Sequence, residues 1–265
     1  MDLGLRDQVA VVTGGSKGIG RAIVSAMAAE GVRVVNVNRE GPEADTLRQE
    51  LEKLGWGDRY HFVAADLSQT ASYAKVVQET LQAFGRLDIL VNNAGVNDGV
   101  GVDATPEEFV QSLYRNLVHV HGLVHCARTE LQRRQGNIIN IGSKVSVTGQ
   151  GNTSAYAAAK GAINSLTREW AVEFAPHAVR VNAVIPAETW TPLYEKWLQT
   201  LPDPAATRHS LEQLIPLGRR FTTCREIADM VTFLASPRSS HTTGQIIFVD
   251  GGYTHLDRKC TASIA

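Results

Sequence analysis

Short apolar runs alternate with amphipathic stretches along the whole chain. Continuous apolar runs predict buried strands at 9–12, 33–37, 60–64, 87–91, 137–141, 179–185 and 245–249. Apolar residues at helical spacing predict helices at 23–31, 44–54, 76–84, 116–134 and 155–174. Strands that are buried on both faces and joined by helices form parallel sheets. The pattern therefore predicts an α/β fold, a doubly wound parallel sheet with helices on both faces.

One stretch interrupts this alternation. Residues 188–216 form a long insertion after the sixth strand. Long excursions at the carboxyl edge of such a sheet usually cover a ligand, so we expect this one to cover the substrate. No internal repeat, low-complexity tract or linker divides the chain. Residues 1–265 are therefore predicted to form a single domain.

The composition limits the classes of function. A chain of 265 residues is long enough for one large hydrophobic core. The net charge of −1 and the pI of about 6.7 give no electrostatic footprint for nucleic acid or an anionic membrane. Cys126, Cys224 and Cys260 are far apart and predict neither a disulfide framework nor a thiolate metal site. The polar first residues and the lack of ~20 consecutive apolar residues predict a soluble, cytoplasmic protein.

A glycine-rich turn follows the first predicted strand. The turn contains Gly14, Ser16, Lys17, Gly18, Ile19 and Gly20. Glycine allows a tight turn and a close approach of the backbone to a pyrophosphate, whose charge lies at the helix N-terminus. An ordinary glycine-rich turn is the alternative. The position between a strand and a helix favours a dinucleotide cradle.

A tyrosine and a lysine one helical turn apart provide the candidate chemistry. Ser143 precedes Tyr156 by thirteen residues, and Lys160 follows Tyr156 by four. A tyrosine phenol holds its proton to pH ~10, so it is a poor base unless a nearby cation stabilises the phenolate. Lys160 lies on the same helix face and supplies this cation. Together with the glycine-rich turn, these residues predict a nicotinamide-dependent oxidoreductase.

These motifs, in this order, resemble the short-chain dehydrogenase/reductase family over nearly the whole chain. The resemblance rests on the glycine spacing G-x-x-x-G-x-G, Asn92-Asn93-Ala94-Gly95 after the fourth strand, Ser143, Tyr156-x-x-x-Lys160 and Asp250-Gly251-Gly252. It implies that Tyr156 exchanges a proton with the substrate oxygen, that Ser143 hydrogen-bonds this oxygen, and that Lys160 binds the nicotinamide ribose. It also implies that Asn116 anchors a water beside the lysine, although a helix N-cap is the alternative for Asn116.

The resemblance assigns further residues to the cofactor. It implies that the cofactor contacts Asp66, Leu67, Asn93, Ala94, Gly95, Pro186, Thr189 and Thr191. Asp66 would contact the adenine, although an aspartate at a strand end is commonly a turn residue. Thr189 and Thr191 would hold the carboxamide. Ala187 replaces the family's glycine after Pro186, and alanine disfavours a positive φ.

The end of the second strand bears on cofactor choice. An enzyme that selects NAD is expected to place Asp or Glu there to accept the ribose 2′-hydroxyl. This chain has Asn38 and Arg39 at this point, and Lys17 in the glycine-rich turn. Two cations and no carboxylate favour a 2′-phosphate, so NADP is the predicted cofactor. The alternative is that both cations are solvated and that NAD is used as well.

Polar residues near the insertion bear on the substrate. The stretches 190–194, 201–207 and 216–219 resemble the branch of the family named L-fucose dehydrogenases, some of which are named 17β-hydroxysteroid dehydrogenases. Glu188 is an unusual carboxylate close to the expected nicotinamide site. Asn97 and Gln150 lie on loops expected to flank Tyr156, which favours a sugar over a steroid. The candidate substrate-binding residues are Asn97, Ser143, Gln150, Tyr156, Glu188 and Trp190.

The predicted function is oxidation of the anomeric hydroxyl of a monosaccharide such as L-fucose to the lactone, with a preference for NADP. The alternatives are a carbonyl, hydroxysteroid or 3-oxoacyl reductase, and a non-catalytic binding protein. The resemblance implies a homodimer or homotetramer built on helices 116–134 and 155–174, with 253–265 as a candidate second interface. No metal site is predicted, because a helix or subunit surface is the favoured place for His119, His121 and His125.

Overall fold

The central feature of the fold is a parallel sheet. The computed structural model describes residues 2–255. Within this range, seven strands form one parallel sheet in the order β3-β2-β1-β4-β5-β6-β9. They are β1 (Val9–Thr13), β2 (Arg33–Asn38), β3 (Tyr60–Ala64), β4 (Ile89–Asn92), β5 (Asn137–Ile141), β6 (Arg180–Pro186) and β9 (Ile246–Val249). The predicted α/β fold class is confirmed.

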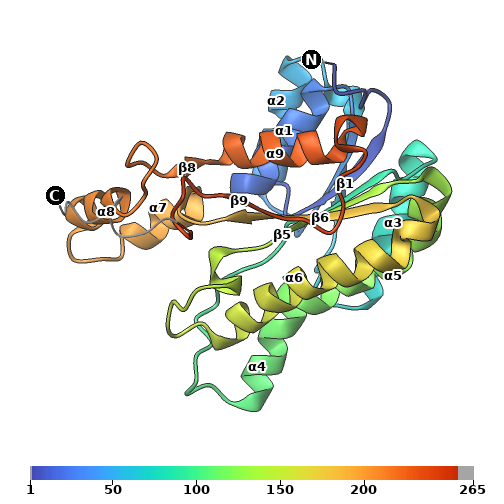
Figure 1. The fold of residues 1–265 in the computed structure, drawn as a ribbon. Helices are drawn as coiled ribbons and strands as arrows, with labels where there is room; N and C mark the ends of the chain where they lie inside the picture. The colour runs from blue at the N-terminus through green and yellow to red at the C-terminus, as the bar shows by residue number, and fades with distance from the viewer. Residues whose placement is uncertain (1, 256–265) are drawn as a thin grey trace.

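Helices cover both faces of the sheet (Figure 1). One layer contains α1 (Gly18–Ala29), α2 (Pro42–Lys53) and α9 (Cys224–Ala235). The other layer contains α3 (Ala71–Phe84), α5 (His119–Arg134) and α6 (Ser154–Phe174). The helix α4 (Pro106–Leu113) runs into α5 through a π-helical segment, Tyr114–Val118. Short 3-10 turns lie at Gly57–Arg59, Lys144–Ser146, Ala175–His177 and Pro237–Ser239.

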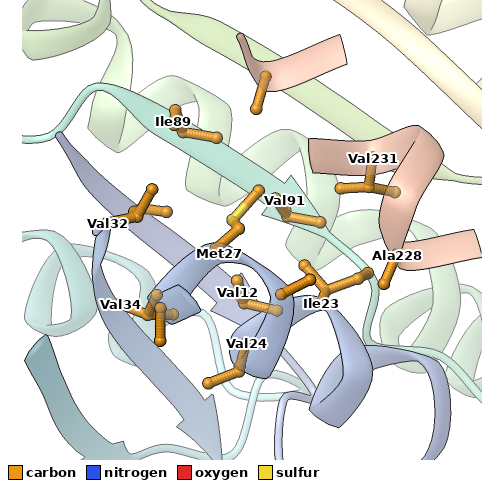
Figure 2. Packing of buried hydrophobic residues seen from close by; sticks show 14 of the residues in the cluster. Val12, Ile23, Val24, Met27, Val32, Val34, Ile89, Val91, Ala228 and Val231 are labelled. Atoms are coloured by element: carbon orange, nitrogen blue, oxygen red, sulfur yellow. The ribbon is translucent and has the colours of Figure 1, made fainter. Parts of the chain in front are cut away.

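Apolar side chains fix α1 against the centre of the sheet. Figure 2 shows Met27 of α1 between side chains of the neighbouring strands, with Val12 on β1 and Val91 on β4. Val231 of α9 belongs to the same buried cluster. Complete burial of one such side chain contributes about 1.5–3 kcal/mol to stability. This core therefore determines where the N-terminus of α1 lies relative to the ends of β1 and β4.

The insertion 188–216 carries its own short elements. They are β7 (Thr189–Trp190), which pairs with β8 (Thr222–Thr223), followed by α7 (Pro192–Leu198) and α8 (Pro204–Gln213). Figure 1 shows α7 and α8 in orange, standing apart from the two helix layers. Leu198 is the buried residue of α7, and α8 has none. The helices of the insertion are therefore weakly buried, and the insertion contacts the rest of the chain through Trp190 and Tyr194, which pack on Phe221.

The structure bears on the expectations for Asn116 and for the candidate interface 253–265. Asn116 lies inside the π-helical segment and not at a helix start, so the alternative of an N-cap is wrong. Of the candidate interface 253–265, residues 256–265 lie outside the described part of the chain, as does Cys260. No helix within residues 2–255 has both the length and the apolar character needed to cross a membrane.

Candidate active site

The glycine-rich turn leaves its backbone open to a ligand. Gly14 and Gly18 have φ angles of 67° and 52°, in the left-handed region that favours glycine. A Cβ atom on Gly20 would lie 2.2 Å from the carbonyl oxygen of Gly14, which no side chain tolerates. The side chain of the N-cap residue Lys17 does not cap α1, so the first N–H groups of this helix remain available to an anion. These features fit the pyrophosphate of a dinucleotide.

A cleft of about 560 Å³ opens next to this turn. It lies where the strand order reverses between β1 and β4, the point at which doubly wound sheets bind nucleotides. Most of the predicted cofactor residues line it: Gly14, Lys17, Gly18, Ile19, Gly20, Asn38, Arg39, Asp66, Leu67, Asn93, Ala94, Gly95, Tyr156, Lys160, Pro186 and Thr191. The fold thus brings motifs from both halves of the chain into one cleft.

Two predicted cofactor residues are absent from this lining within the described chain. Ser16 is buried, and its Oγ accepts a hydrogen bond of 3.1 Å from Asn36 Nδ2, which fixes the turn from behind. Thr189 is also buried, and its hydroxyl has no hydrogen-bond partner among residues 2–255. A buried polar group without a partner costs about 1–3 kcal/mol. Thr189 therefore fits an additional polar group, as a carboxamide would supply.

Asn93 joins the turn after β1 to the loop after β4. Its Nδ2 donates to the carbonyl oxygens of Thr13 and Gly14 at 2.8 and 3.2 Å. Thr13 Oγ1 in turn accepts from the backbone N–H groups of Asn93 and Ala94, each at 2.9 Å. Because these bonds tie the two loops together, Asn93 supports the shape of the cleft with its side chain.

Asn116 and Lys160 meet behind Gly95. Asn116 Oδ1 and Lys160 Nζ lie 3.2 and 3.5 Å from the Cβ position that Gly95 leaves empty. Asn116 Oδ1 accepts from the backbone N–H of Val96 at 2.7 Å, and Lys160 Nζ donates to the Ile141 carbonyl at 2.7 Å. Burial lowers the pKa of Lys160 to about 8. The lysine therefore remains largely cationic at neutral pH.

Tyr156 faces the same part of the cleft. Lys160 Nζ lies 5.6 Å from the centroid of the Tyr156 ring. Burial raises the pKa of Tyr156, and a hydrogen bond with Ser143 acts in the opposite direction. Burial sets the direction of the shift, and Lys160 does not contribute to it, so the lowering of the tyrosine pKa expected from Lys160 is not found in the protein alone. A phenolate at neutral pH requires further positive charge beside the ring.

The two predicted phosphate-binding cations differ in whether an acidic side chain already pairs with them. Lys17 Nζ forms a 2.6 Å ion pair with Glu43 Oε1 in the first turn of α2. Arg39 is exposed and has no ion-pair partner within residues 2–255. Asn38 Oδ1 accepts from the Arg39 backbone N–H at 2.9 Å. Of the two cations, Arg39 is therefore the one available to bind a phosphate. The sequence analysis did not identify Glu43 as the partner of Lys17.

Asp66 closes a turn and also lines the cleft. It lines the cleft, and its Oδ1 accepts hydrogen bonds from the Ser68 N–H at 3.0 Å and from Ser68 Oγ at 2.8 Å. These bonds close the turn after β3 and lower the pKa of the Asp66 carboxyl. The turn holds the carboxylate at the rim of the cleft.

Glu188 is buried, and both of its carboxylate oxygens have partners. Oε1 is paired with Lys144 Nζ, and Oε2 accepts a 2.6 Å hydrogen bond from the Tyr194 hydroxyl. Lys144 directly follows Ser143, and its Nζ lies 4.2 Å from the centroid of the Tyr253 ring. Lys144 and Tyr194, which sequence reasoning missed, thus already bind the carboxylate that the sequence assigns to the substrate. The network joins the end of β5 to α7.

Trp190, Asn97 and Gln150 form no hydrogen bond with Glu188 among the described residues. Trp190 packs against Phe221, which follows the insertion, and against Arg208 within it, with its ring 5.3 Å from the Phe221 ring and 4.2 Å from the Arg208 guanidinium carbon. Asn97 and Gln150 are exposed on two loops. Asn97 Oδ1 accepts a 3.4 Å hydrogen bond from the Gly99 N–H, and both side chains are otherwise exposed to solvent.

The three histidines do not share one environment. His121 and His125 are exposed, whereas His119 is fully buried, so the predicted surface position of His119 is wrong. Its Nε2 lies 3.1 Å from the Arg115 carbonyl oxygen, and its Nδ1 has no partner among the described residues. Burial, together with the charge of Lys160, lowers the pKa of His119 to about 4. His119 lines the cleft as a neutral imidazole.

Known proteins match almost the whole chain. A family model described as enoyl-(acyl carrier protein) reductase matches residues 14–254. The chain is 37% identical over 258 residues to L-fucose dehydrogenase of Mus musculus, covering 97% of this chain and 92% of that protein. It is 38% identical over 257 residues to L-xylulose reductase of Bos taurus, covering 96% and 99%. The crystal structure of Cj0485 dehydrogenase superposes with a TM-score of 0.93 at 44% identity, covering 97% of this chain and 98% of that one.

Proposed function

Because this chain belongs to the short-chain dehydrogenase/reductase family, we propose that it oxidises the anomeric hydroxyl of a monosaccharide such as L-fucose to the lactone. It is an oxidoreductase that uses a nicotinamide cofactor, and NADP is the cofactor we propose it prefers. The observation that carries the proposal is the convergence of Ser143, Tyr156 and Lys160 beside the glycine-rich turn. The similarity to L-fucose dehydrogenase and L-xylulose reductase supports a sugar as the substrate.

Tyr156 acts as the general base in this proposal. The Tyr156 phenolate takes the proton of the anomeric hydroxyl, and Ser143 donates a hydrogen bond to the same oxygen. The oxidised cofactor, when bound, would supply the acceptor for the hydride of the anomeric carbon and positive charge near the phenol. A change of three units in the tyrosine pKa requires about 4 kcal/mol of differential stabilisation. Lys160 provides a fixed part of this stabilisation as a buried cation.

Backbone groups and a few side chains hold the cofactor. The glycine-rich turn and the N-terminus of α1 bind the pyrophosphate, and Thr189 and Thr191 bind the carboxamide. Arg39 binds the 2′-phosphate of NADP, while Lys17 contributes less because Glu43 neutralises it. Use of NAD in addition to NADP is the alternative.

The substrate side is built around the insertion. We propose that 188–216 covers the sugar within a single domain of residues 1–265, and that Asn97 and Gln150 bind its hydroxyls. Each carboxylate oxygen accepts about two hydrogen bonds, so Glu188 retains capacity for a sugar hydroxyl beside Lys144. We further propose a cytoplasmic homodimer or homotetramer built on α5 and α6.

A steady-state panel of substrates tests the proposal. L-fucose, D-arabinose, D-glucose, acyclic polyols, a hydroxysteroid and a 3-oxoacyl substrate are each assayed with NADP and with NAD. We expect the highest kcat/KM with L-fucose or D-arabinose, because a site that hydrogen-bonds a hydroxyl discriminates strongly against its absence. A higher kcat/KM with the steroid or the acyl ketone would overturn the sugar assignment. Failure of every substrate would favour a non-catalytic binding protein.

A further inference from the structure

His119 is a buried imidazole to which the chemistry above gives no role. It begins α5, directly after the π-helical segment that carries Asn116. Its Nε2 lies 3.1 Å from the Arg115 carbonyl oxygen. A carbonyl oxygen only accepts hydrogen bonds, so the proton of the neutral ring is on Nε2 and Nδ1 is an acceptor. This acceptor is buried and has no donor within the described residues.

Lys160 has unused hydrogen-bond donors. Its ammonium has three N–H donors, and its hydrogen bond within residues 2–255 uses one of them, at the Ile141 carbonyl. Both residues line the same cleft, and the charge of Lys160 contributes to the low pKa of His119. The charge of Lys160 therefore reaches His119, and the lysine has unused donors while the imidazole has an unused acceptor.

Burial, and then the charge of Lys160, keep the imidazole of His119 neutral. Lys160 of α6 lines the same cleft as His119, and the guanidinium of Arg115 is held by Asp98 at 2.7 Å. Among residues 2–255, Lys160 is the charged side chain that shifts the pKa of His119, and no carboxylate acts to favour a charged imidazole. A neutral ring with a fixed tautomer can orient a hydrogen-bond donor without exchanging its own proton.

We propose that His119 is a positioning residue for proton release behind Lys160. Its Nδ1 accepts a hydrogen bond from a water that lies between the imidazole and the lysine ammonium. During sugar oxidation, the proton taken by Tyr156 leaves through Lys160 and this water to solvent, and His119 stays neutral throughout. The inference rests on the proposed function only in that Tyr156 takes a proton from the substrate.

Three substitutions separate this role from a structural one. In His119→Asn, the amide oxygen can replace Nδ1 as the acceptor. His119→Gln can keep the donor to the Arg115 carbonyl but loses the acceptor at the Nδ1 position, and His119→Phe loses both. Each variant is assayed for kcat and KM across the pH range, in H₂O and D₂O, and for NADP affinity by fluorescence titration.

We expect a kcat for oxidation roughly tenfold lower in the Gln and Phe variants, with a larger solvent isotope effect, because proton release becomes slower. The Asn variant should stay within about threefold of the wild type, and KM and NADP affinity should change less than about twofold in all variants. An unchanged kcat in His119→Gln would overturn the proposal. So would a folded Asn variant, as judged by its Tm, that is as slow as the Phe variant.

The tautomer offers a second test, which needs neither substrate nor cofactor. The ¹⁵N resonances of the His119 ring should report a neutral ring with the proton on Nε2 from about pH 6 to pH 9. A proton on Nδ1, or a charged ring in this range, would contradict the proposed acceptor. If the substrate panel identifies a compound other than a sugar, the same variants are tested with that compound, so the two proposals fail independently.

Discussion

On the cofactor side of the cleft, the wall is mostly backbone. The turn from Gly14 to Gly20 packs so closely that one added Cβ would meet a carbonyl oxygen, and α1 behind it is anchored in the buried core of Figure 2. On the substrate side, the wall consists of side chains on weakly buried helices. Leu198 is the buried residue of α7, and α8 has none. The hydrogen bond from Tyr194 to Glu188, together with the ion pair between Glu188 and Lys144, joins α7 to the end of β5.

This difference indicates how each wall responds to change. A backbone wall fits a group whose shape never varies, such as a pyrophosphate, and tolerates few substitutions. A wall of side chains outside the main core can change with little effect on stability, which allows one fold to accept many substrates. We therefore expect substitutions on the cofactor wall to alter folding and cofactor affinity together. Substitutions on the substrate wall should alter KM for the substrate alone.

The largest effect is expected at Tyr156, where the two walls meet. Tyr156→Phe should lower kcat by at least about 10²-fold, because general acid–base catalysis contributes 10²–10⁴. Cofactor affinity should change little, since the phenol hydroxyl moves a proton and the glycine-rich turn does the binding. Steady-state kinetics and a fluorescence titration with NADP measure the two effects. Lys160→Ala, in comparison, should lower both kcat and the affinity for NADP. Retention of more than about a hundredth of the wild-type rate by Tyr156→Phe would contradict its role as the base.

The next largest effect is expected at Gly20. Gly20→Ala places a Cβ 2.2 Å from the Gly14 carbonyl oxygen, so the turn must shift. Overpacking costs about 1–3 kcal/mol, which corresponds to roughly a five- to 150-fold loss of cofactor affinity if the turn bears it. The matched control is Gly149→Ala on the loop after Ser143, where a Cβ would meet no atom within 4 Å. Equal Tm values and equal NADP affinities for the two variants would contradict the claim that the cofactor wall tolerates substitution less well than the rest of the cleft.

A smaller effect is expected at the phosphate-binding end. Arg39→Ala should reduce kcat/KM for NADP roughly ten- to a hundredfold, because a hydrogen bond to a charged group contributes about 1.5–3 kcal/mol. Adding Asn38→Asp should move the preference toward NAD. Lys17→Ala should cost less than about threefold, because Glu43 already neutralises this lysine. An unchanged ratio of NADP to NAD efficiency in the double variant would show that these residues do not bind the phosphate.

The smallest effect is expected on the substrate wall. Tyr194→Phe keeps the aromatic contacts of the ring and removes only the hydrogen bond to Glu188. A net hydrogen bond is worth about 0.5–1.5 kcal/mol, so KM for the sugar should rise roughly two- to tenfold while NADP affinity stays constant. Glu188→Ala is a poorer test, because it leaves the Lys144 ammonium buried without a partner and destabilises the fold. A loss of NADP affinity in Tyr194→Phe would mean that a change on the substrate wall also alters cofactor binding.

Sequence alone predicted the sheet because strands buried on both faces appear as continuous apolar runs, as 137–141 does for β5. The helices α7 and α8 were missed, because an element that buries little shows no clear hydrophobic period. Their cap signals were nevertheless present, since Thr191 and Asp203 each precede a proline and cap the helix that follows.

The sequence likewise predicts only some of the residues of the cleft. The glycine-rich turn and Tyr156 could be predicted because chemistry fixes their residue types and spacing. Glu43, Lys144 and His119 could not, since each acts through a contact with a segment distant in the chain. No local pattern encodes such contacts.

The π-helical segment Tyr114–Val118 has a consequence for the evolution of this protein. Such a segment is typically one extra residue accommodated within an α-helix, and it is frequent at functional sites. Deleting one residue there should give a regular helix from α4 to α5 and a more stable chain, but Asn116 would no longer lie behind Gly95. Selection for heat resistance without selection for turnover should therefore remove this residue, as expected where stability and activity are opposed.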